Sequence, residues 1–369
     1  MSALTRFHLA SIAPSLLLAL LTACSGGNKD NTSAATGPAA TGKDAPASAA
    51  AAATKIALGA YTTPREAYGT AVLPAFRAQW KTKTGGELTV QESYLGSGAQ
   101  ARAIVGGFEA DVAALSLEPD IEKIRKAGLI THDWKAGEHG GMVTRSVVVI
   151  GVRKGNPKQI KDWDDLAKPG VEVLTPDVRT SGGAMWNVAA LYGAALRGQT
   201  SAAKGDSAAA IKLLGNVLHN VKVFDRGARE SLLSFEQGLG DAIITYENEI
   251  LVGRSTGKDY EYVVPKSTIL IENPAAVVDG YTKKHGTQQA AAAFVAFLHT
   301  PEAQRAFAKY GLRPVLPAVA NEVAASFPAV TDLFTIRDLG DWAGVQKSLF
   351  DKGTGYDAAL AAAQRPGGS

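Results

Sequence analysis

Predicted strands alternate with predicted helices along most of this chain, and this alternation limits the folds that it can adopt. The predicted strands cover residues 55–60, 87–94, 110–116, 146–152, 171–175, 221–225 and 241–247. Helices are predicted from about 62 to 84, over 99–106, 118–127 and 228–237, and through much of the C-terminal third. Chains of this kind form a mostly parallel sheet that is covered by helices on both faces. We therefore predict an α/β fold.

Four of the turns between a strand and a helix carry small residues or hydroxyls where the helix begins. They are residues 61–63 (Tyr-Thr-Thr), 96–98 (Gly-Ser-Gly), 181–183 (Ser-Gly-Gly) and 227–229 (Gly-Ala-Arg). Ligands of open α/β sheets bind where such helices begin. The first backbone N–H groups of a helix are unpaired and lie at the positive end of its dipole, which favours anions. Two turns from each of two lobes would form a cage of donors for a small, fully ionised oxyanion.

The turn at Ser181 also has a simpler interpretation. It follows the strand 171–175 and the helix-breaking Pro176, so a helix begins near Ser181. A serine in this position caps an ordinary helix without any ligand. The case for an anion site therefore depends on the other three turns as well.

The N-terminus has the features of a targeting segment. Arg6 precedes the apolar run 12–21, which is too short to span a bilayer stably. Residues 21–24 (Leu-Thr-Ala-Cys) resemble the bacterial lipobox, whose cysteine is lipidated; a plain signal-peptidase site is the alternative. We predict a lipoprotein signal peptide over 1–23, lipidation at Cys24 and a disordered, low-complexity tether over 24–54. Because Cys24 is the one cysteine in the sequence, no disulfide framework is expected.

Composition and residue spacing argue against several other classes of protein. A net charge of +3 over 369 residues, without a dense basic run, does not indicate nucleic-acid binding. The six histidines include no pair at metal-ligand spacing. Asp162, Asp164 and Asp165 resemble a solvated turn and helix start, and Ser181 has no base nearby in the sequence. We predict no catalytic residues, no metal and no cofactor.

Several motifs between about Lys55 and Tyr356 match one family when they are taken together. They are Tyr61 with Arg65-Glu66, Gly96-Ser97-Gly98, residues 153–160 (Arg-Lys-Gly-Asn-Pro-Lys-Gln-Ile), Ser181-Gly182-Gly183-Ala184 with Trp186-Asn187, Gly227-Ala228-Arg229 and Glu247-Asn248-Glu249. In this combination the chain resembles the sulfate/thiosulfate-binding proteins that feed ABC importers, a branch of the type II periplasmic binding proteins. The resemblance implies two lobes, each a mostly parallel sheet flanked by helices, with a ligand cleft between them. We expect lobe 1 to comprise 55–145 plus 270–369, and lobe 2 to comprise 146–269.

The resemblance also implies a sulfate that is held by hydrogen bonds without counter-ions. Carried over by position, the ligand-binding residues are Thr62, Ser97, Ser181, Gly182, Gly183, Ala228 and Tyr246. The Ser181 hydroxyl and the N–H groups of Thr62, Gly182, Gly183 and Ala228 are the expected donors, together with the Ser97 site. Arg65 and Arg229 are expected to orient the loops by pairing with carboxylates such as Glu66 or Asp225.

Two positions depart from the family pattern, which has Asp at Thr62 and an indole at Tyr246. An indole N–H only donates a hydrogen bond, whereas a phenol can also accept one. A cage made only of donors rejects protonated phosphate, because the phosphate hydroxyl would have no acceptor. Tyr246 therefore either donates to the anion and weakens this rejection of phosphate, or fits a larger oxyanion such as thiosulfate. The alternative is a tolerated aromatic residue in the wall of the site.

The expected function is that of a periplasmic, membrane-anchored lipoprotein that captures sulfate and delivers it to ABC permease subunits. We expect a monomer that closes over its ligand by hinge motion and is not an enzyme. Thiosulfate, phosphate or another tetrahedral oxyanion is the alternative ligand, and oxyanion sensing is the alternative role. An enzyme on the same architecture would need an acid/base or metal constellation in the cleft, which the sequence does not show.

Overall fold

The computed structural model describes residues 53–365, so the predicted signal peptide, Cys24 and nearly all of the predicted tether lie outside the described residues. The strands are β1 (Thr54–Tyr61), β2 (Leu88–Leu95), β3 (Val112–Ala114), β4 (Met142–Arg153), β5 (Val173–Pro176), β6 (Val221–Asp225), β7 (Ala242–Tyr246), β8 (Tyr260–Val263), β9 (Ser267–Val277) and β10 (Asp332–Phe334). They form one ten-stranded sheet in the order β2-β1-β3-β9-β4-β7-β5-β6, with β10 beside β9 and β8 beside β4.

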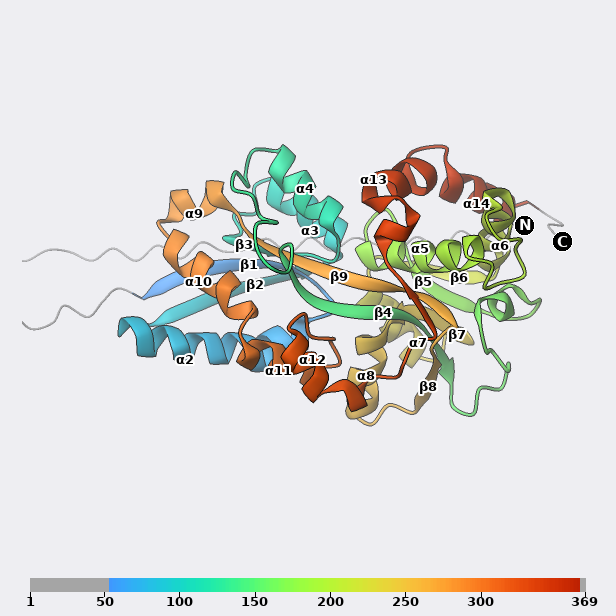
Figure 1. The fold of residues 1–369 in the computed structure, drawn as a ribbon, viewed down its shortest axis with the longest axis horizontal. Coiled ribbons are helices and arrows are strands. Elements are labelled where there is room, and N and C mark those ends of the chain that lie inside the picture. The colour runs from blue at the N-terminus through green and yellow to red at the C-terminus, as the bar shows by residue number, and fades with distance from the viewer. Residues whose placement is uncertain (1–52, 366–369) are drawn as a thin grey trace, which may run out of the picture. The chain divides into compact units, whose positions relative to one another are not determined.

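Two long antiparallel strands, β4 and β9, connect the halves of this sheet. Residues 142–147 of β4 pair with β9, and residues 148–152 pair with β7. On β9, residues 270–274 pair with β4 and residues 275–277 pair with β3. The pairs on either side of this junction are parallel: β1 with β2 and β3, and β5 with β6 and β7. The chain therefore has two lobes that share β4 and β9, which cross the middle of Figure 1.

In the first lobe, helices cover both faces of the sheet. They are α1 (Arg65–Ala67), α2 (Leu73–Thr84), α3 (Ser97–Val105), α4 (Glu118–Lys126), α9 (Asp279–His285), α10 (Gln288–Leu298), α11 (Pro301–Lys309) and α12 (Pro317–Glu322). Val112 and Ala114 of β3 pack in one cluster with α2, α10 and α11, whereas Ala113 packs in a second cluster with α3 and α4. Alternate side chains of a strand point to opposite faces, so the two clusters lie on opposite sides of the sheet.

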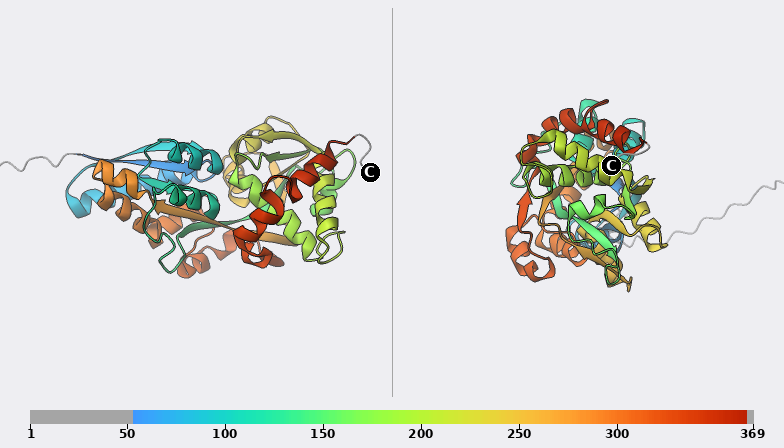
Figure 2. Two further views of the ribbon diagram at one scale, coloured as in Figure 1. Left: turned by 90° about the horizontal axis from the view of Figure 1, so that it is seen from above. Right: turned by 90° about the vertical axis from the view of Figure 1, so that its right-hand side faces the viewer.

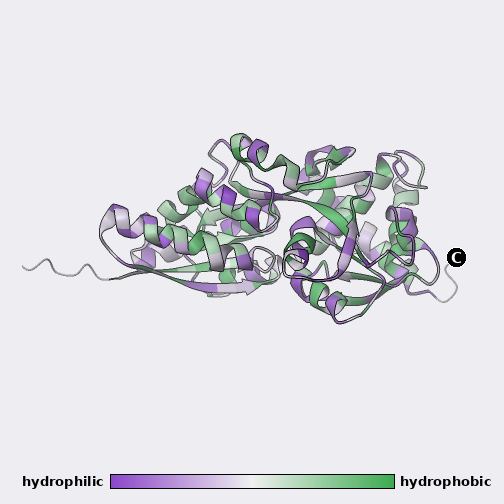
Figure 3. Cartoon of the chain, turned by 90° about the horizontal axis from the view of Figure 1, so that it is seen from below, coloured by the Kyte–Doolittle hydropathy of each residue, from purple (hydrophilic) through white to green (hydrophobic). Residues whose placement is uncertain are grey.

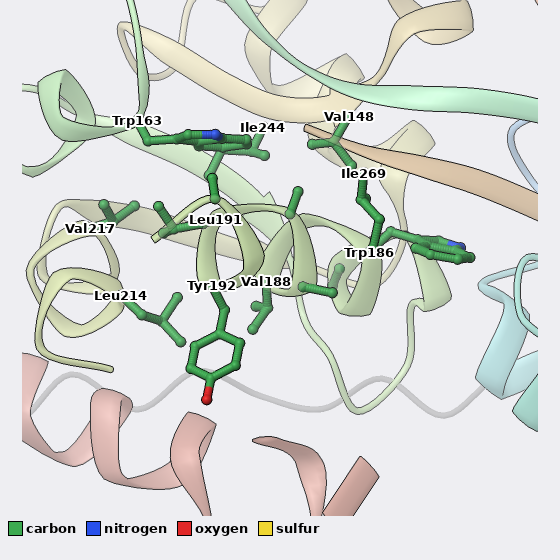
Figure 4. Packing of buried hydrophobic residues seen from close by; sticks show 14 of the residues in the cluster. Val148, Trp163, Trp186, Val188, Leu191, Tyr192, Leu214, Val217, Ile244 and Ile269 are labelled. Atoms are coloured by element: carbon green, nitrogen blue, oxygen red, sulfur yellow. The ribbon is translucent and has the colours of Figure 1, made fainter. Parts of the chain in front are cut away.

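The second lobe is built in the same way. Its helices are α5 (Gly182–Leu196), α6 (Ser207–His219), α7 (Ala228–Glu236), α8 (Glu247–Ser255), α13 (Asp341–Val345) and α14 (Gly355–Ala363). Helix α5 is buried along most of its length, as expected for a helix that is hydrophobic on all sides. Figure 4 shows Leu191 and Tyr192 of α5 beside Leu214 and Val217 of α6, with Trp186 at the other end of α5. In Figure 3 the flanking helices carry both hydrophobic and hydrophilic stretches, which is typical of helices with one face on a core.

The segment from α13 to α14 packs in the second lobe, whereas the predicted boundary assigned all of 270–369 to lobe 1. Helix α14 packs against α6, and the Trp342 ring meets the Trp186 ring edge-on at 4.7 Å. Trp342, Phe350 and Tyr356 are buried in the core of the second lobe. In Figures 1 and 2 the red C-terminal helices accordingly lie beside α5 and α6. The apolar faces of these helices complete the second core, so this segment belongs with lobe 2.

None of the helices in residues 53–365 combines the length and the apolar character that are needed to cross a membrane.

Candidate ligand-binding site

The four turns that stand out in the sequence meet where the two lobes face each other. The N–H of Ala99, in the first lobe, donates a 3.3 Å hydrogen bond to the carbonyl of Thr180, just before α5. A Cβ atom on Gly227, in the second lobe, would lie 3.7 Å from Oγ1 of Thr62 in the first. The fold thus brings together two turns from each lobe.

Backbone N–H groups at these turns are left open. Among residues 53–365, no protein acceptor faces the N–H groups of Thr62, Ser97, Gly182, Gly183 or Ala228. Helices α3, α5 and α7 begin at these turns, so several of the open groups also lie at the positive ends of helices. The arrangement can bind a compact anion through backbone donors alone.

The start of α5 is the most crowded part of the site. Ser181 caps the helix, because its buried Oγ accepts a 3.3 Å hydrogen bond from the N–H of Ala184. A Cβ atom on Gly183 would lie 2.9 Å from Cε2 of Tyr246 and 3.4 Å from Cβ of Ala228. Glycine is therefore required for the close approach of Ser181, Gly183, Ala228 and Tyr246.

The Ser181 hydroxyl retains a proton of its own to donate. Within residues 53–365 this proton has no protein acceptor, and Ser181 is only 3% exposed. A capping serine accepts through its oxygen, which leaves the O–H available to a ligand. The interpretation of Ser181 as a helix cap is confirmed, and it is compatible with anion binding.

The Ser97 hydroxyl, in contrast, already makes hydrogen bonds within the protein. Its Oγ donates to Oδ2 of Asp120 at 2.7 Å and accepts the N–H of Ser116 at 3.0 Å. Ser97 and Asp120 are both buried. Of the Ser97 site, the backbone N–H is therefore the group open to a ligand.

Tyr246 lies at the end of β7 and is 1% exposed. Its hydroxyl is 2.6 Å from Oγ of Ser116, a first-lobe residue. Burial raises the pKa of Tyr246, so its hydroxyl is neutral at physiological pH. Ser116 was not among the ligand-binding residues predicted from the sequence, although it lies two residues after the end of β3, in the region where ligands of α/β sheets bind.

Arg229 joins the lobes beside this site. Its guanidinium donates to Oε1 and Oε2 of Glu66, in the first lobe, at 2.6 and 2.8 Å. Its Nε lies 2.9 Å from Oε2 of Glu249, whose pKa is raised by burial. The predicted pairing of Arg229 with Glu66 is confirmed. The guanidinium carbon of Arg65, in contrast, lies 5.6 Å from the centre of the Tyr94 ring.

Comparison with known proteins gives the family. The family described as bacterial extracellular solute-binding protein matches residues 59–313. The sulfate-binding protein of Synechococcus elongatus is 44% identical over 305 residues, which cover 82% of this chain and 85% of the relative. The sulfate-binding protein of Escherichia coli (strain K12) is 41% identical, covering 77% of this chain and 86% of the relative. The thiosulfate-binding protein of the same strain is 36% identical, covering 84% and 92%.

A solved structure gives the same result. The sulfate-binding protein SubI from Mycobacterium tuberculosis H37Rv is 41% identical, with a TM-score of 0.74, and the match covers 81% of this chain and all of that one. A periplasmic thiamin binding protein, 14% identical with a TM-score of 0.63, shares the fold. These comparisons confirm the predicted two-lobed type II fold. They also confirm the prediction that the chain is a binding protein rather than an enzyme, and that it acts outside the cytoplasm. The chain belongs to the bacterial extracellular solute-binding proteins, in the branch of the sulfate- and thiosulfate-binding proteins.

Proposed function

We propose that this protein captures sulfate between its two lobes and delivers it to the permease of an ABC importer. The observation that carries the proposal is the convergence of open backbone N–H groups from turns of both lobes. Relatives with 37–44% identity over most of the chain are named sulfate-binding proteins, which supports sulfate as the ligand.

The proposed mechanism uses hydrogen bonds rather than ion pairs. Thr62, Ser97, Gly182, Gly183 and Ala228 donate through backbone N–H groups, and Ser181 and Tyr246 donate through hydroxyls. A hydrogen bond to an ionised acceptor is about twice as strong as a neutral one, and a dry site strengthens it further. Helix termini spread the counter-charge, which avoids the desolvation cost of a buried ion pair.

Closure of the lobes would complete the cage. Bending of β4 and β9, the two strands shared by both lobes, is the proposed hinge motion. In an open form the donors of the first lobe would separate from those of the second. Capture is therefore proposed to couple anion binding to closure, which the permease can recognise.

We also propose that lipid on Cys24 anchors the protein, as a monomer, to the cell envelope. Metabolic labelling with radioactive palmitate tests this: label is expected on the wild type and absent from Cys24→Ala. Label on neither protein would contradict the anchor.

Calorimetric titration tests the ligand. The purified protein, stripped of anion by unfolding and refolding, is titrated with sulfate and with thiosulfate. Tight sulfate binding that is nearly independent of pH is expected, because sulfate keeps its charge and the proposed donors do not titrate near neutral pH. No heat with either anion would contradict a site for sulfate or thiosulfate.

Two alternatives have separate outcomes. Thiosulfate binding much more tightly than sulfate would identify thiosulfate as the ligand, which the thiosulfate-binding relatives support as the second candidate. Loss of sulfate uptake when the gene is deleted is expected of a transport protein. Normal uptake in the deletion strain would favour a sensor.

A further inference from the structure

Two buried hydroxyls, one from each lobe, lie in contact at the candidate site. Oγ of Ser116 and Oη of Tyr246 are 2.6 Å apart, and the two residues are 0% and 1% exposed. The backbone carbonyl of Ser116 accepts from Nε1 of Trp186 at 2.9 Å and from Nδ2 of Asn273 at 3.0 Å. These bonds fix Ser116 in place and leave its hydroxyl to Tyr246.

The pair holds one proton more than its own hydrogen bond uses. Two neutral hydroxyls carry two protons, and either oxygen can donate to the other. Within residues 53–365, the remaining proton has no protein acceptor. A buried donor without a partner is costly, so the remaining proton indicates a ligand oxygen beside the pair.

The pair lies directly against the start of α5. A Cβ atom on Gly182 would come within 2.7 Å of Oγ of Ser116, and one on Gly183 within 2.9 Å of the Tyr246 ring. The open N–H groups of Gly182 and Gly183 therefore flank the two hydroxyls. An anion held by these N–H groups would meet the pair as well.

We propose that Ser116 and Tyr246 together determine specificity, and that they admit singly protonated tetrahedral oxyanions, the class that includes hydrogen phosphate. This inference rests on the proposed function, because it needs an oxyanion between the lobes. A protonated ligand oxygen donates to one hydroxyl, that hydroxyl donates to its partner, and the partner donates to another oxygen of the ligand. No covalent bond changes, and every proton in this ring has an acceptor.

Both hydroxyls are needed to accept a hydrogen bond from a protonated ligand oxygen while every proton keeps an acceptor. A lone hydroxyl in a dry site can accept from a ligand only if its own proton has another acceptor. Removing either hydroxyl therefore leaves a single donor, which suits fully ionised sulfate and no longer suits a protonated oxyanion. Sulfate offers acceptors only, so it gains nothing from the second oxygen.

Calorimetric titration of the full protein with sulfate and inorganic phosphate tests the inference, since phosphate carries at least one proton near neutral pH. We expect the wild type to bind both anions. Ser116→Ala and Tyr246→Phe, each missing one oxygen atom, are each expected to lower the ratio of phosphate affinity to sulfate affinity by about tenfold. The double variant is expected to lose no more of this ratio than either single variant.

Tyr262→Phe is the matched control, because it removes the same atom from a half-buried tyrosine on β8 and should leave the ratio unchanged. If the wild type binds sulfate but does not bind phosphate, the inference is overturned and the proposed function stands. If Ser116→Ala and Tyr246→Phe lower the affinity for sulfate and for phosphate equally, the inference is also overturned. A contact that only holds the lobes together would affect the affinity for both ligands alike. Binding of neither anion by the wild type would overturn the proposed function and the inference with it.

Discussion

The two lobes present similar turns to the site but prepare them differently. In the second lobe, Ser181, Gly182 and Gly183 begin a long buried helix, and no acceptor within residues 53–365 takes the proton of the Ser181 hydroxyl. In the first lobe, the Ser97 hydroxyl is already bonded to Asp120 and to the N–H of Ser116. The second lobe thus offers a preformed set of donors, whereas the Ser97 hydroxyl of the first lobe is already hydrogen-bonded within that lobe. Similar sequence motifs can therefore contribute to one site in unequal ways.

The largest effect is expected from filling the space beside α5. The Gly183→Ala substitution is expected to lower sulfate affinity by about a hundredfold, because its Cβ would displace Tyr246 or the anion. Gly69→Ala is the control, since its Cβ would make only an ordinary 3.6 Å contact with Glu92. Calorimetric titration measures both. Equal affinities in the two variants would show that the second lobe is not the preformed part of the site.

A large effect on folding is expected from Glu249, which is fully buried and pairs with the partly buried Arg229 in the second lobe. The Glu249→Gln substitution is expected to cost about 3 kcal/mol of unfolding free energy, measured by denaturant titration, because it removes one partner of a buried ion pair. Glu66→Gln removes the partner in the first lobe and leaves Arg229 paired with Glu249. It is expected to accelerate release of sulfate in stopped-flow experiments while changing stability little. The reverse pattern would contradict a lobe-bridging role for Glu66.

The two serines provide the sharpest test of the difference between the lobes. Ser181→Ala is expected to lower sulfate affinity by about tenfold, because it removes a charge-assisted hydrogen bond. Ser97→Ala is expected to cost about 1 kcal/mol of stability and to change affinity less, because its hydroxyl serves Asp120. Titration calorimetry and thermal unfolding of both variants separate the two roles. A greater loss of affinity in Ser97→Ala than in Ser181→Ala would invert the comparison.

The smallest effect is expected from a histidine remote from the site. Hydrogen bonds from His285 to Glu109 and Asp111 raise the pKa of His285 above its ordinary value of about 6.5. Since the folded pKa is the higher one, its stabilising contribution is fully present below about pH 6.5 and is lost as pH rises through the folded pKa. Relative to His285→Gln, the wild type should lose stability over this range in denaturant titrations. A constant difference between the two proteins would contradict the shift.

Much of the fold follows from local sequence signals, and part of it does not. The alternation of strands and helices predicts lobes in which helices cover both faces of a sheet, and the turns at Ser97 and Ser181 predict where helices α3 and α5 begin. Helix α6 was not predicted, although Asp206 caps it by accepting from the N–H groups of Ala208 and Ala209. The position of α14 on α6 depends on packing between segments that are far apart in the chain, which no local pattern encodes.

The site shows the same division. Small residues and hydroxyls at helix starts identify the donors, because each depends on its own turn. The pairing of Ser116 with Tyr246 joins residues 130 positions apart, so neither position suggests the other. The commitment of the Ser97 hydroxyl to Asp120 likewise appears only when the two elements are packed together.

A crystal structure with bound sulfate tests the central claim most directly. We expect sulfate between the lobes, within hydrogen-bond distance of the N–H groups of Gly182, Gly183 and Ala228 and of the Ser181 hydroxyl. Arg229 should remain bonded to Glu66 without touching the anion. A sulfate held by the Arg229 guanidinium, or bound away from the start of α5, would contradict a site made of uncharged donors.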